Sequence, residues 1–568
     1  MIFSNLWRWL AQRSPGIVLI ATVWFSYSAI SREAHLRAFI TEDGTAEYLE
    51  WEPDAWTVPF VYYCLSVSFL LPILCVRACW SVRDLTLRLR AVESDRLTVV
   101  GDADLRCPEV IHAIIVPNYS EDIEVLRETL EVLAAHPQAR DSYRICLAME
   151  QREDGGKKKA STLVEEFHDK FSSIQYTLHP ADIAGDAAGK GSNVAWAASR
   201  LSEAYAHVDR KNVVITVIDA DSHLLAPYFT QLTKMHIEAG EKASCNFYAA
   251  PIIFDRNSQQ VNAIVRIADI FWGAYGISGL YSGSTISPPT SVYSLPLELV
   301  DLAGGWDPGS EAIGEDLHMY LKCFFALNGR LIPKTILSAV SQTDVPGLHA
   351  RYKQALRHMW GALDCGYILR KSATMWMNRK RSCARSRPLH LALDLDAFDV
   401  DEIESGKIPN IKTWPLERPN WYRTLGIGYR LFEGHVLPLQ GILVAVSTVI
   451  LAPRLALNPQ TEPLTHLLAI CTSLRHLGLG MTIVYLYLYG KFFRLCASRR
   501  SEAMDKAGLS TGMHFSKRTF WISIVDFLAS PVVLPLFAIL PGVQAQVSHF
   551  WTSDLAYKVS DKAVRGKK

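Results

Sequence analysis

The chain of 568 residues exceeds what a single small domain needs, so roughly two to four structural units are expected. Lys and Arg number 58 against 57 Asp and Glu, a net charge of +1, which excludes both a basic surplus for nucleic-acid binding and an acidic surplus typical of disorder. Hydrophobic residues make up 49% of the chain, so membrane segments beside a soluble domain are expected, and eleven cysteines without a C-x-x-C pair argue against a disulfide scaffold.

Two apolar runs near the start of the chain enclose an acidic loop. The first covers residues 15–30 and follows Arg8 and Arg13, and the second covers residues 56–80. By the positive-inside rule, the arginines before the first run and those after the second place both flanks in the cytoplasm. Residues 1–100 are therefore predicted to form two transmembrane helices joined by an acidic extracytoplasmic loop.

Residues 105–350 alternate short apolar runs with helical stretches, the pattern of an α/β domain with a largely parallel sheet. All three of the clearest strands run into polar residues. Because ligands bind at the carboxyl ends of strands in open α/β sheets, we expect the site at this edge. The three predicted strands are residues 110–116, 143–149 and 213–218.

Asp219-Ala220-Asp221 follows the third of these strands. Two carboxylates at the end of a buried strand offer the oxygen ligands that Mg²⁺ or Mn²⁺ prefers, and such a metal would assist the departure of a diphosphate. The triplet alone fits a strand-to-helix turn better, because Asp is also common in turns. Only the surrounding motifs can reverse that interpretation.

Three further apolar runs follow residue 431. Residues 436–451 and 464–489 are predicted spans, and the basic loop after them is predicted to be cytoplasmic. The last run, residues 520–547, contains Asp526 and three prolines, so a plain span and a re-entrant or interfacial hairpin both stay open.

Arg475 and His476 lie well inside the run at residues 464–489. An ionisable residue at that depth is a candidate for lining a polar channel. The alternative is a helix that starts later, with Arg475 reaching toward a lipid headgroup.

Six motifs occur in an order that resembles the glycosyltransferases of family 2, of the membrane-integrated type that includes cellulose, chitin and hyaluronan synthases. The resemblance covers about residues 105–365, and it implies an α/β GT-A fold, Rossmann-like and cytosolic, inserted between transmembrane helices. The motifs are Pro117-Asn118-Tyr119-Ser120-Glu121, Glu150, Gly189-Lys190-Gly191-Ser192-Asn193, Asp219-Ala220-Asp221, Gly304-Gly305-Trp306 with Gly314-Glu315-Asp316, and Gln354-Ala355-Leu356-Arg357.

The resemblance implies the chemistry as well as the fold. We expect inverting transfer of a sugar from a nucleotide-diphosphate donor, with a UDP-sugar favoured and Mg²⁺ or Mn²⁺ as cofactor. Asp316 would be the catalytic base, and Asp221 and Asp219 would be the metal ligands. Contacts to the nucleotide sugar are expected from Pro117, Tyr119, Glu121, Glu150, Lys190, Asn193, Asp219 and Arg357, and contacts to the acceptor from Trp306, Glu315, Gln354 and Trp360.

Departures from the family pattern keep two acceptors open. His358 stands in place of the Trp of Q-x-x-R-W, the nearest aromatic being Trp360, and Gly314 replaces the usual Thr of T-E-D. Residues 557–562 resemble the F-x-V-T-P-K gating loop only loosely. A growing polysaccharide translocated through the membrane is the first choice, and non-processive transfer to a lipid is the alternative.

Several of these residues also fit a purely structural role. Asp316 also suits the start of a helix, where acids are favoured, and Lys190 and Arg357 also suit an ordinary charged surface. A catalytically silent membrane module and a transporter are the competing classes. We expect an integral membrane protein of the plasma membrane or the Golgi and ER, with a donor, a glycan or lipid acceptor and membrane lipids as partners, and the oligomeric state open.

The predicted partition has five parts. They are two spans with their loop in residues 1–100, the GT-A domain in residues 105–350, the Q-x-x-R motif with membrane-interface helices in residues 351–430, two spans in residues 431–492, and a basic loop, an apolar element and a cytosolic tail in residues 493–568.

Overall fold

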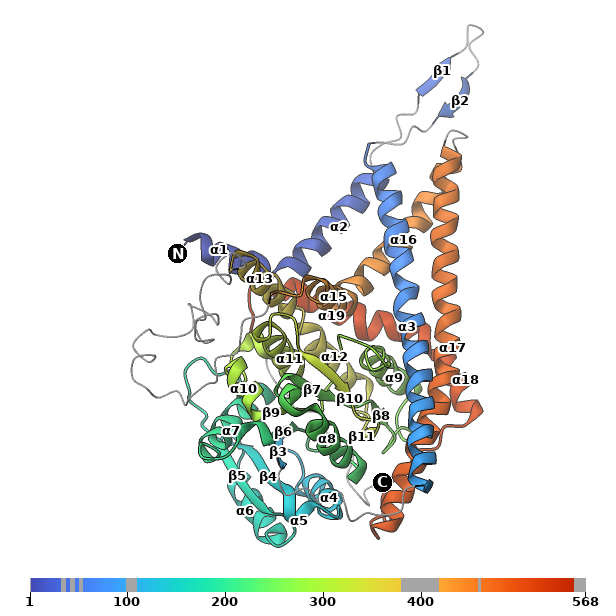
Figure 1. The fold of residues 1–568 in the computed structure, drawn as a ribbon. Coiled ribbons are helices and arrows are strands. Elements are labelled where there is room, and N and C mark those ends of the chain that lie inside the picture. The colour runs from blue at the N-terminus through green and yellow to red at the C-terminus, as the bar shows by residue number, and fades with distance from the viewer. Residues whose placement is uncertain are drawn as a thin grey trace.

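The computed structural model describes residues 2–31, 37–40, 46–50, 55–98, 110–378, 418–457 and 461–555. Within them, an α/β domain lies against a group of long helices drawn from both ends of the chain (Figure 1). A short hairpin, β1 (Arg37–Ile40) and β2 (Ala46–Glu50), lies at the far end of those helices.

The α/β domain is built on a seven-stranded sheet of order β10-β7-β9-β6-β3-β4-β5. Most neighbours in it are parallel, and only β9 runs antiparallel, to both β6 and β7. The strands are β3 (Ile111–Asn118), β4 (Tyr143–Glu150), β5 (Ser173–His179), β6 (Val213–Val217), β7 (Asn246–Ala249), β9 (Tyr293–Pro296) and β10 (Ile332–Thr335), while β8 (Ile252–Phe254) pairs separately with β11 (Val340–Gln342).

Helices cover both faces of this sheet, because its central strands are apolar on both sides. In β3, Ala113 and Ile115 face one core while Ile114 and Val116 face the other, as the two-residue period of a strand requires. Burying each such aliphatic side chain contributes roughly 1.5–3 kcal/mol. The first core is shared with α7 (Lys190–Ala204), α10 (Leu297–Ala303) and α11 (Glu315–Ala326), and the second with α4 (Ile123–Ala134), α6 (Gly156–Phe167) and α8 (Ala226–Ala239).

In the described parts of the chain, four helical segments are long enough and apolar enough to cross a membrane. They include the runs predicted at residues 56–80, 436–451 and 464–489, and also the run at residues 520–547, which continues as one helical segment through a π-helical stretch, Pro535–Ile539. The segments are Thr57–Val92 within α3 (Thr57–Thr98), Trp421–Leu455 with α15 (Trp421–Leu431) and α16 (Leu437–Leu455), α17 (Glu462–Lys506), and Phe520–Ser548 with α18 (Phe520–Leu534) and α19 (Leu540–Ser548).

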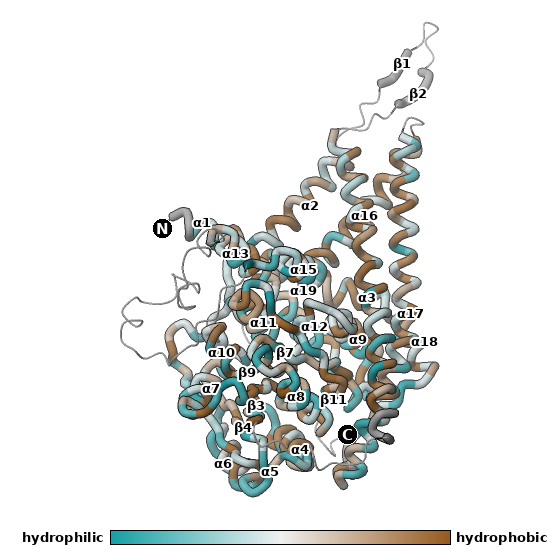
Figure 2. The backbone as a smooth tube through the Cα atoms, in the orientation of Figure 1, coloured by the Kyte–Doolittle hydropathy of each residue, from teal (hydrophilic) through white to brown (hydrophobic). Residues whose placement is uncertain are grey.

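The first predicted span is shorter than the others. Residues 15–30 lie in α2 (Ser14–Ser31), whose 18 residues give a length of about 27 Å, close to the thickness of a hydrocarbon core. Apolar residues recur along α2, α3, α16 and α17, whereas polar ones are commoner around α5 (Ala139–Ser142) and α6 at the opposite end (Figure 2).

Three further helices connect the α/β domain to this group. They are α9 (Ala263–Ile277), which packs on α18, α12 (Leu348–Trp360), which packs on α19, and α13 (Leu363–Asn378), which packs on α1 (Ile2–Gln12). The predicted gating loop at residues 557–562 lies outside the described residues, as does part of the predicted interface region.

Candidate active site

The carboxyl ends of three neighbouring parallel strands bring the first motifs together. β3 ends at Asn118 and β4 at Glu150, and their register pairs Asn118 with Met149. Asn193, in the first turns of α7, donates from Nδ2 to the carbonyl oxygen of Ala148 at 2.7 Å, so α7 is fixed to this edge. Motifs that are far apart in the sequence are therefore adjacent in the fold.

A cavity of about 1350 Å³ opens at this edge, and Asp219, Asp221 and Asp316 all line it. Asp219 and Asp221 follow β6, whereas Asp316 lies in the first turn of α11. The cavity wall also includes the predicted donor residues Pro117, Tyr119, Glu121, Glu150, Lys190, Asn193 and Arg357, and the predicted acceptor residues Glu315 and Gln354.

Lys190 links the acidic groups of the site. Its Nζ lies 2.8 Å from Asp219 Oδ1 and 2.8 Å from Glu315 Oε1. Burial alone would lower the pKa of Lys190, but the charges of Asp219, Glu315 and Asp316 outweigh it and raise the pKa. The ammonium group is therefore charged at any physiological pH.

A close approach of two backbone segments makes this contact possible. A Cβ on Gly191 would lie 3.2 Å from the carbonyl oxygen of Ala312, so a glycine at this position lets the start of α7 approach the loop before α11. Similarly, Gly304 and Gly305 have φ of 76° and 72°, which side-chain-bearing residues rarely adopt, and they turn the chain after α10.

Asp221 is more deeply buried than Asp219. It is buried, and its Oδ2 accepts hydrogen bonds from the backbone N–H and the hydroxyl of Thr343. Asp219 Oδ2 accepts from Gln342 Nε2 at 2.9 Å and from the hydroxyl of Ser291. Neutral donors therefore hold Oδ2 of each carboxylate, while Asp219 Oδ1 contacts the ammonium group of Lys190.

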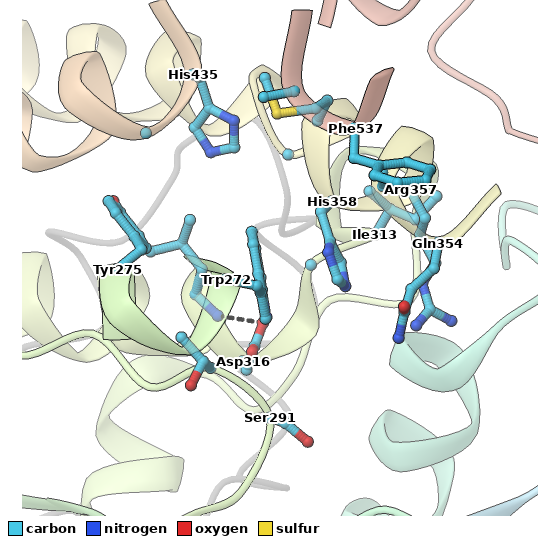
Figure 3. Close-up of a pocket in the computed structure, with 18 of the residues that line it drawn as sticks. Trp272, Tyr275, Ser291, Ile313, Asp316, Gln354, Arg357, His358, His435 and Phe537 are labelled. Carbon is cyan, nitrogen blue, oxygen red and sulfur yellow. Dashed lines mark hydrogen bonds between the residues drawn. The ribbon is translucent and has the colours of Figure 1, made fainter. Parts of the chain in front are cut away.

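The predicted base, Asp316, faces the cavity from the start of α11 (Figure 3). Its Oδ1 accepts from the backbone N–H of Leu317 at 2.8 Å. Burial raises the pKa of Asp316, against the opposing charge of Lys190, and burial raises the pKa of the adjacent Glu315 to about 7. A carboxylate with a raised pKa is a stronger proton acceptor, as a general base requires.

Glu121 and Glu150, two of the predicted nucleotide-sugar contacts, are held by hydrogen bonds and an ion pair. Glu121 Oε2 accepts from the Tyr119 backbone N–H and from Asn118 Nδ2, both at 2.7 Å, so this side chain fixes the turn after β3. Glu150 is buried and pairs with Arg152, with Nη2 2.6 Å from Oε2. These bonds hold Glu121 and Glu150 in place on the cavity wall.

Two predicted acceptor contacts are not on the cavity wall. Trp306 is buried in the core beside α11, where its Nε1–H donates to the hydroxyl of Tyr293 at 2.7 Å. Trp360 is buried too, and its Nε1–H donates to the carbonyl oxygen of Ser553 at 2.8 Å. Both indole N–H groups have partners within the protein, so the structure does not bring these two tryptophans together with the other predicted site residues.

The sequence comparison decides the family. Residues 214–490 match the family model described as "Glycosyl transferase family group 2". This part of the chain is a family 2 glycosyltransferase domain. The prediction of an enzyme with an α/β GT-A fold is confirmed, and no curated protein matches the sequence.

A comparison with solved structures finds glycosyltransferases of low sequence identity. The mannosyltransferase PcManGT of Pyrobaculum calidifontis, solved with GDP-Man and Mn²⁺, is 13% identical, with 72% of this chain and 99% of that chain covered and a TM-score of 0.35. S. aureus TarS, residues 1–349, is 12% identical, with 61% of this chain and 91% of that chain covered and a TM-score of 0.31. The same fragment has been solved in complex with UDP.

Trp272 is a cavity residue of this glycosyltransferase that no motif indicates. It belongs to α9, and its ring stacks on that of His358, with centroids 3.8 Å apart and planes 13° apart (Figure 3). Burial, and then the charges of Arg351 and Arg357, lower the pKa of His358 well below its usual value, so the imidazole is neutral. The pair presents an aromatic surface near the position where the family has a single Trp.

Gln342 and Thr343 were also missed. They come at the end of β11, a strand of three residues, and both line the cavity. The residues before them, Leu337-Ser338-Ala339-Val340-Ser341, mix apolar and polar side chains and give no signal that selects Gln342 and Thr343.

The carboxylates of Asp219 and Asp221 are suitable ligands for Mg²⁺ or Mn²⁺, although they are few. No cluster of three or more His, Cys, Asp or Glu that could hold a metal occurs in the described parts of the chain. Mg²⁺ is commonly held by one or two carboxylates, several waters and the phosphates of a substrate. Asp219 and Asp221 can fill that role, with Ser291, Gln342 and Thr343 orienting them.

Proposed function

We propose that this glycosyltransferase performs inverting, metal-dependent transfer of a sugar from a nucleotide diphosphate, with a UDP-sugar as the expected donor. The observation that carries the proposal is the single cavity shared by Asp219, Asp221 and Asp316 at the carboxyl edge of the sheet. A base, and a pair of carboxylates that could hold a cation against the leaving diphosphate, on one cavity are what a displacement at an anomeric carbon needs.

Each group has one task in this proposal. Asp316 accepts the proton of the acceptor hydroxyl as that oxygen attacks the anomeric carbon. Asp219 and Asp221 would hold a Mg²⁺ or Mn²⁺ ion, which supplies neutralisation of the leaving diphosphate when bound. Lys190 and Arg357 add fixed positive charge on the same wall.

The acceptor enters from the side of the candidate spanning helices, since the cavity is continuous with them. The expected setting is a membrane with the catalytic domain on its cytosolic face. The family resemblance favours a growing polysaccharide as acceptor, and a lipid is the alternative.

Asp316→Asn tests the base. The amide keeps the size and the hydrogen bond from Leu317 but cannot take a proton, so transfer should fall by about 10²–10⁴-fold while UDP binding is retained. Transfer from radiolabelled UDP-sugars and calorimetric UDP binding are measured in parallel. Asp169→Asn, at a side chain that is 77% exposed, is the matched control.

The transfer assay distinguishes the proposed function from the alternative of a catalytically silent membrane protein. An Asp316→Asn enzyme with wild-type transfer would refute the base assignment. Absence of both transfer and donor hydrolysis in the wild-type protein, across UDP- and GDP-sugars with Mg²⁺ or Mn²⁺, would favour the silent membrane module.

A further inference from the structure

The cavity of the glycosyltransferase does not end at the acceptor motif. It continues between α3, α16 and α17, the helices long and apolar enough to cross a membrane. Its wall there includes Ala445, eight residues beyond the start of α16 at Leu437, which corresponds to about 12 Å along the helix axis. We call this extension the membrane arm of the cavity.

Aliphatic side chains dominate the wall of the membrane arm. They come from all three helices and from α18, and the polar side chains among them include Arg475, Thr482 and Tyr485 of α17. Representative members are Leu71, Leu74, Ile442, Ala445, Leu479 and Leu534.

Two polar groups of the arm, Thr482 and Arg475, have partners within the protein, whereas the buried hydroxyl of Tyr485 has none among the described residues. Thr482 Oγ1 donates to the carbonyl oxygen of Gly478 at 3.0 Å, within its own helix. Arg475 Nη2 donates to Thr472 Oγ1 at 2.9 Å, and its Nη1 to Ser68 Oγ at 3.4 Å. Arg475 was a candidate for lining a polar channel. In the structure it lines the arm and donates to two neighbouring hydroxyls.

These walls distinguish between the two acceptors. Each sugar unit of a polysaccharide carries several hydroxyls, and each one buried without a hydrogen-bond partner costs about 1–3 kcal/mol. A hydrocarbon chain that moves from a bilayer into an aliphatic cavity exchanges one apolar environment for another, at almost no cost. The arm suits a lipid chain and disfavours a glycan.

The junction between the arm and the catalytic end is aromatic. The stacked Trp272 and His358 lie between Asp316 and the helices above, with Tyr275 beside Trp272 at a centroid distance of 6.4 Å (Figure 3). Aromatic rings with a polar edge are typical of places where an apolar region meets a polar one. A head group would lie at this junction, with its hydroxyl toward Asp316.

We infer that the acceptor is a membrane lipid with a hydroxylated head group, whose hydrocarbon chain occupies the membrane arm. This inference rests on the proposed function. The lipid oxygen forms the new bond to the anomeric carbon, the bond from that carbon to the diphosphate oxygen breaks, the diphosphate leaves with the electron pair, and the proton goes to Asp316. The product is a glycolipid carrying one added sugar.

Reconstitution of the full chain tests the acceptor class. Vesicles of phosphatidylcholine alone are compared with vesicles that also contain total membrane lipid from the expression host, using radiolabelled UDP-glucose, UDP-N-acetylglucosamine, UDP-galactose and GDP-mannose. We expect a solvent-extractable product that needs the added lipid and whose mass shows one sugar. A long, water-soluble labelled polymer would overturn the inference while leaving the proposed function intact, whereas no transfer and no donor hydrolysis would overturn both.

A pair of neighbouring substitutions tests the membrane arm itself. Ala445→Phe places a ring inside the arm, whereas Val446→Phe places the same ring at a position that is 53% exposed on the outside of α16. Ala445→Phe should lower transfer to lipid about tenfold or more, whereas Val446→Phe should leave both transfer and donor hydrolysis unchanged. Equal transfer in both variants would refute a role for the arm, and Ile442→Phe repeats the test if Ala445→Phe does not fold.

Discussion

Lys190 contacts two carboxylates of the candidate active site. Its ammonium group lies 2.8 Å from an oxygen of Asp219 and 2.8 Å from an oxygen of Glu315. Lys190→Met removes that charge and raises the pKa of Asp316 further, since Lys190 opposes the effect of burial. The base must be ionised to act, so the acid limb of the pH–rate profile should move to higher pH and transfer at neutral pH should fall about tenfold or more. Lys234→Met, at a side chain that is 67% exposed, is the control, and an unchanged pH profile would contradict the assignment.

The sequence predicted part of this site at the level of single residues. Asp219, Asp221, Asp316 and Lys190 could be singled out because each lies in a motif of fixed order at a strand or helix end. Trp272 could not, because α9 carries no motif and its contact with His358 exists only once α9 packs beside α12. A pattern along the chain does not encode which helix faces which.

At the scale of an element, α11 is fixed by a residue two positions after the predicted base. His318 Nδ1 lies 2.6 Å from Asp364 Oδ1, on α13, and its Nε2 lies 2.9 Å from Asp307 Oδ2. Burial would lower the pKa of His318, but these carboxylates outweigh it and raise the pKa to about 9. The imidazolium therefore ties α11 to two other segments at neutral pH.

His318→Gln should make the stability of the enzyme less dependent on pH. Because the folded pKa is above the ordinary 6.5, the stabilisation from His318 is complete below pH 6.5 and is lost as the pH rises through about 9. Thermal unfolding in lipid discs should show a wild-type decline across this window that the variant lacks. His466→Gln, at a 72% exposed side chain, should behave as wild type, and parallel curves for wild type and His318→Gln would contradict the assignment.

At the scale of the whole molecule, composition predicted where the apolar helices lie but not how far they extend. The run predicted at residues 464–489 is part of a helix of 45 residues. Its polar end leaves the apolar region and packs on the α/β domain, where buried Arg500 lies 3.3 Å from Asp255. Hydropathy detects the part of a helix that suits a bilayer, whereas the remainder is decided by contacts between residues far apart in sequence.

Asp526 gives the corresponding test of how the helices are joined to the catalytic domain. It is fully buried on α18, with Arg266 of α9 2.7 Å away and Arg518 2.8 Å away. Asp526→Asn removes the carboxylate that pairs with buried Arg518 and half-buried Arg266, which should cost about 3–5 kcal/mol, and transfer should fall as well because α18 forms part of the cavity wall. Thermal unfolding and transfer are measured together, with Asp505→Asn, at an exposed position near the end of α17, as the control. Wild-type unfolding of the Asp526→Asn protein would show that α18 is held on the domain by apolar packing alone.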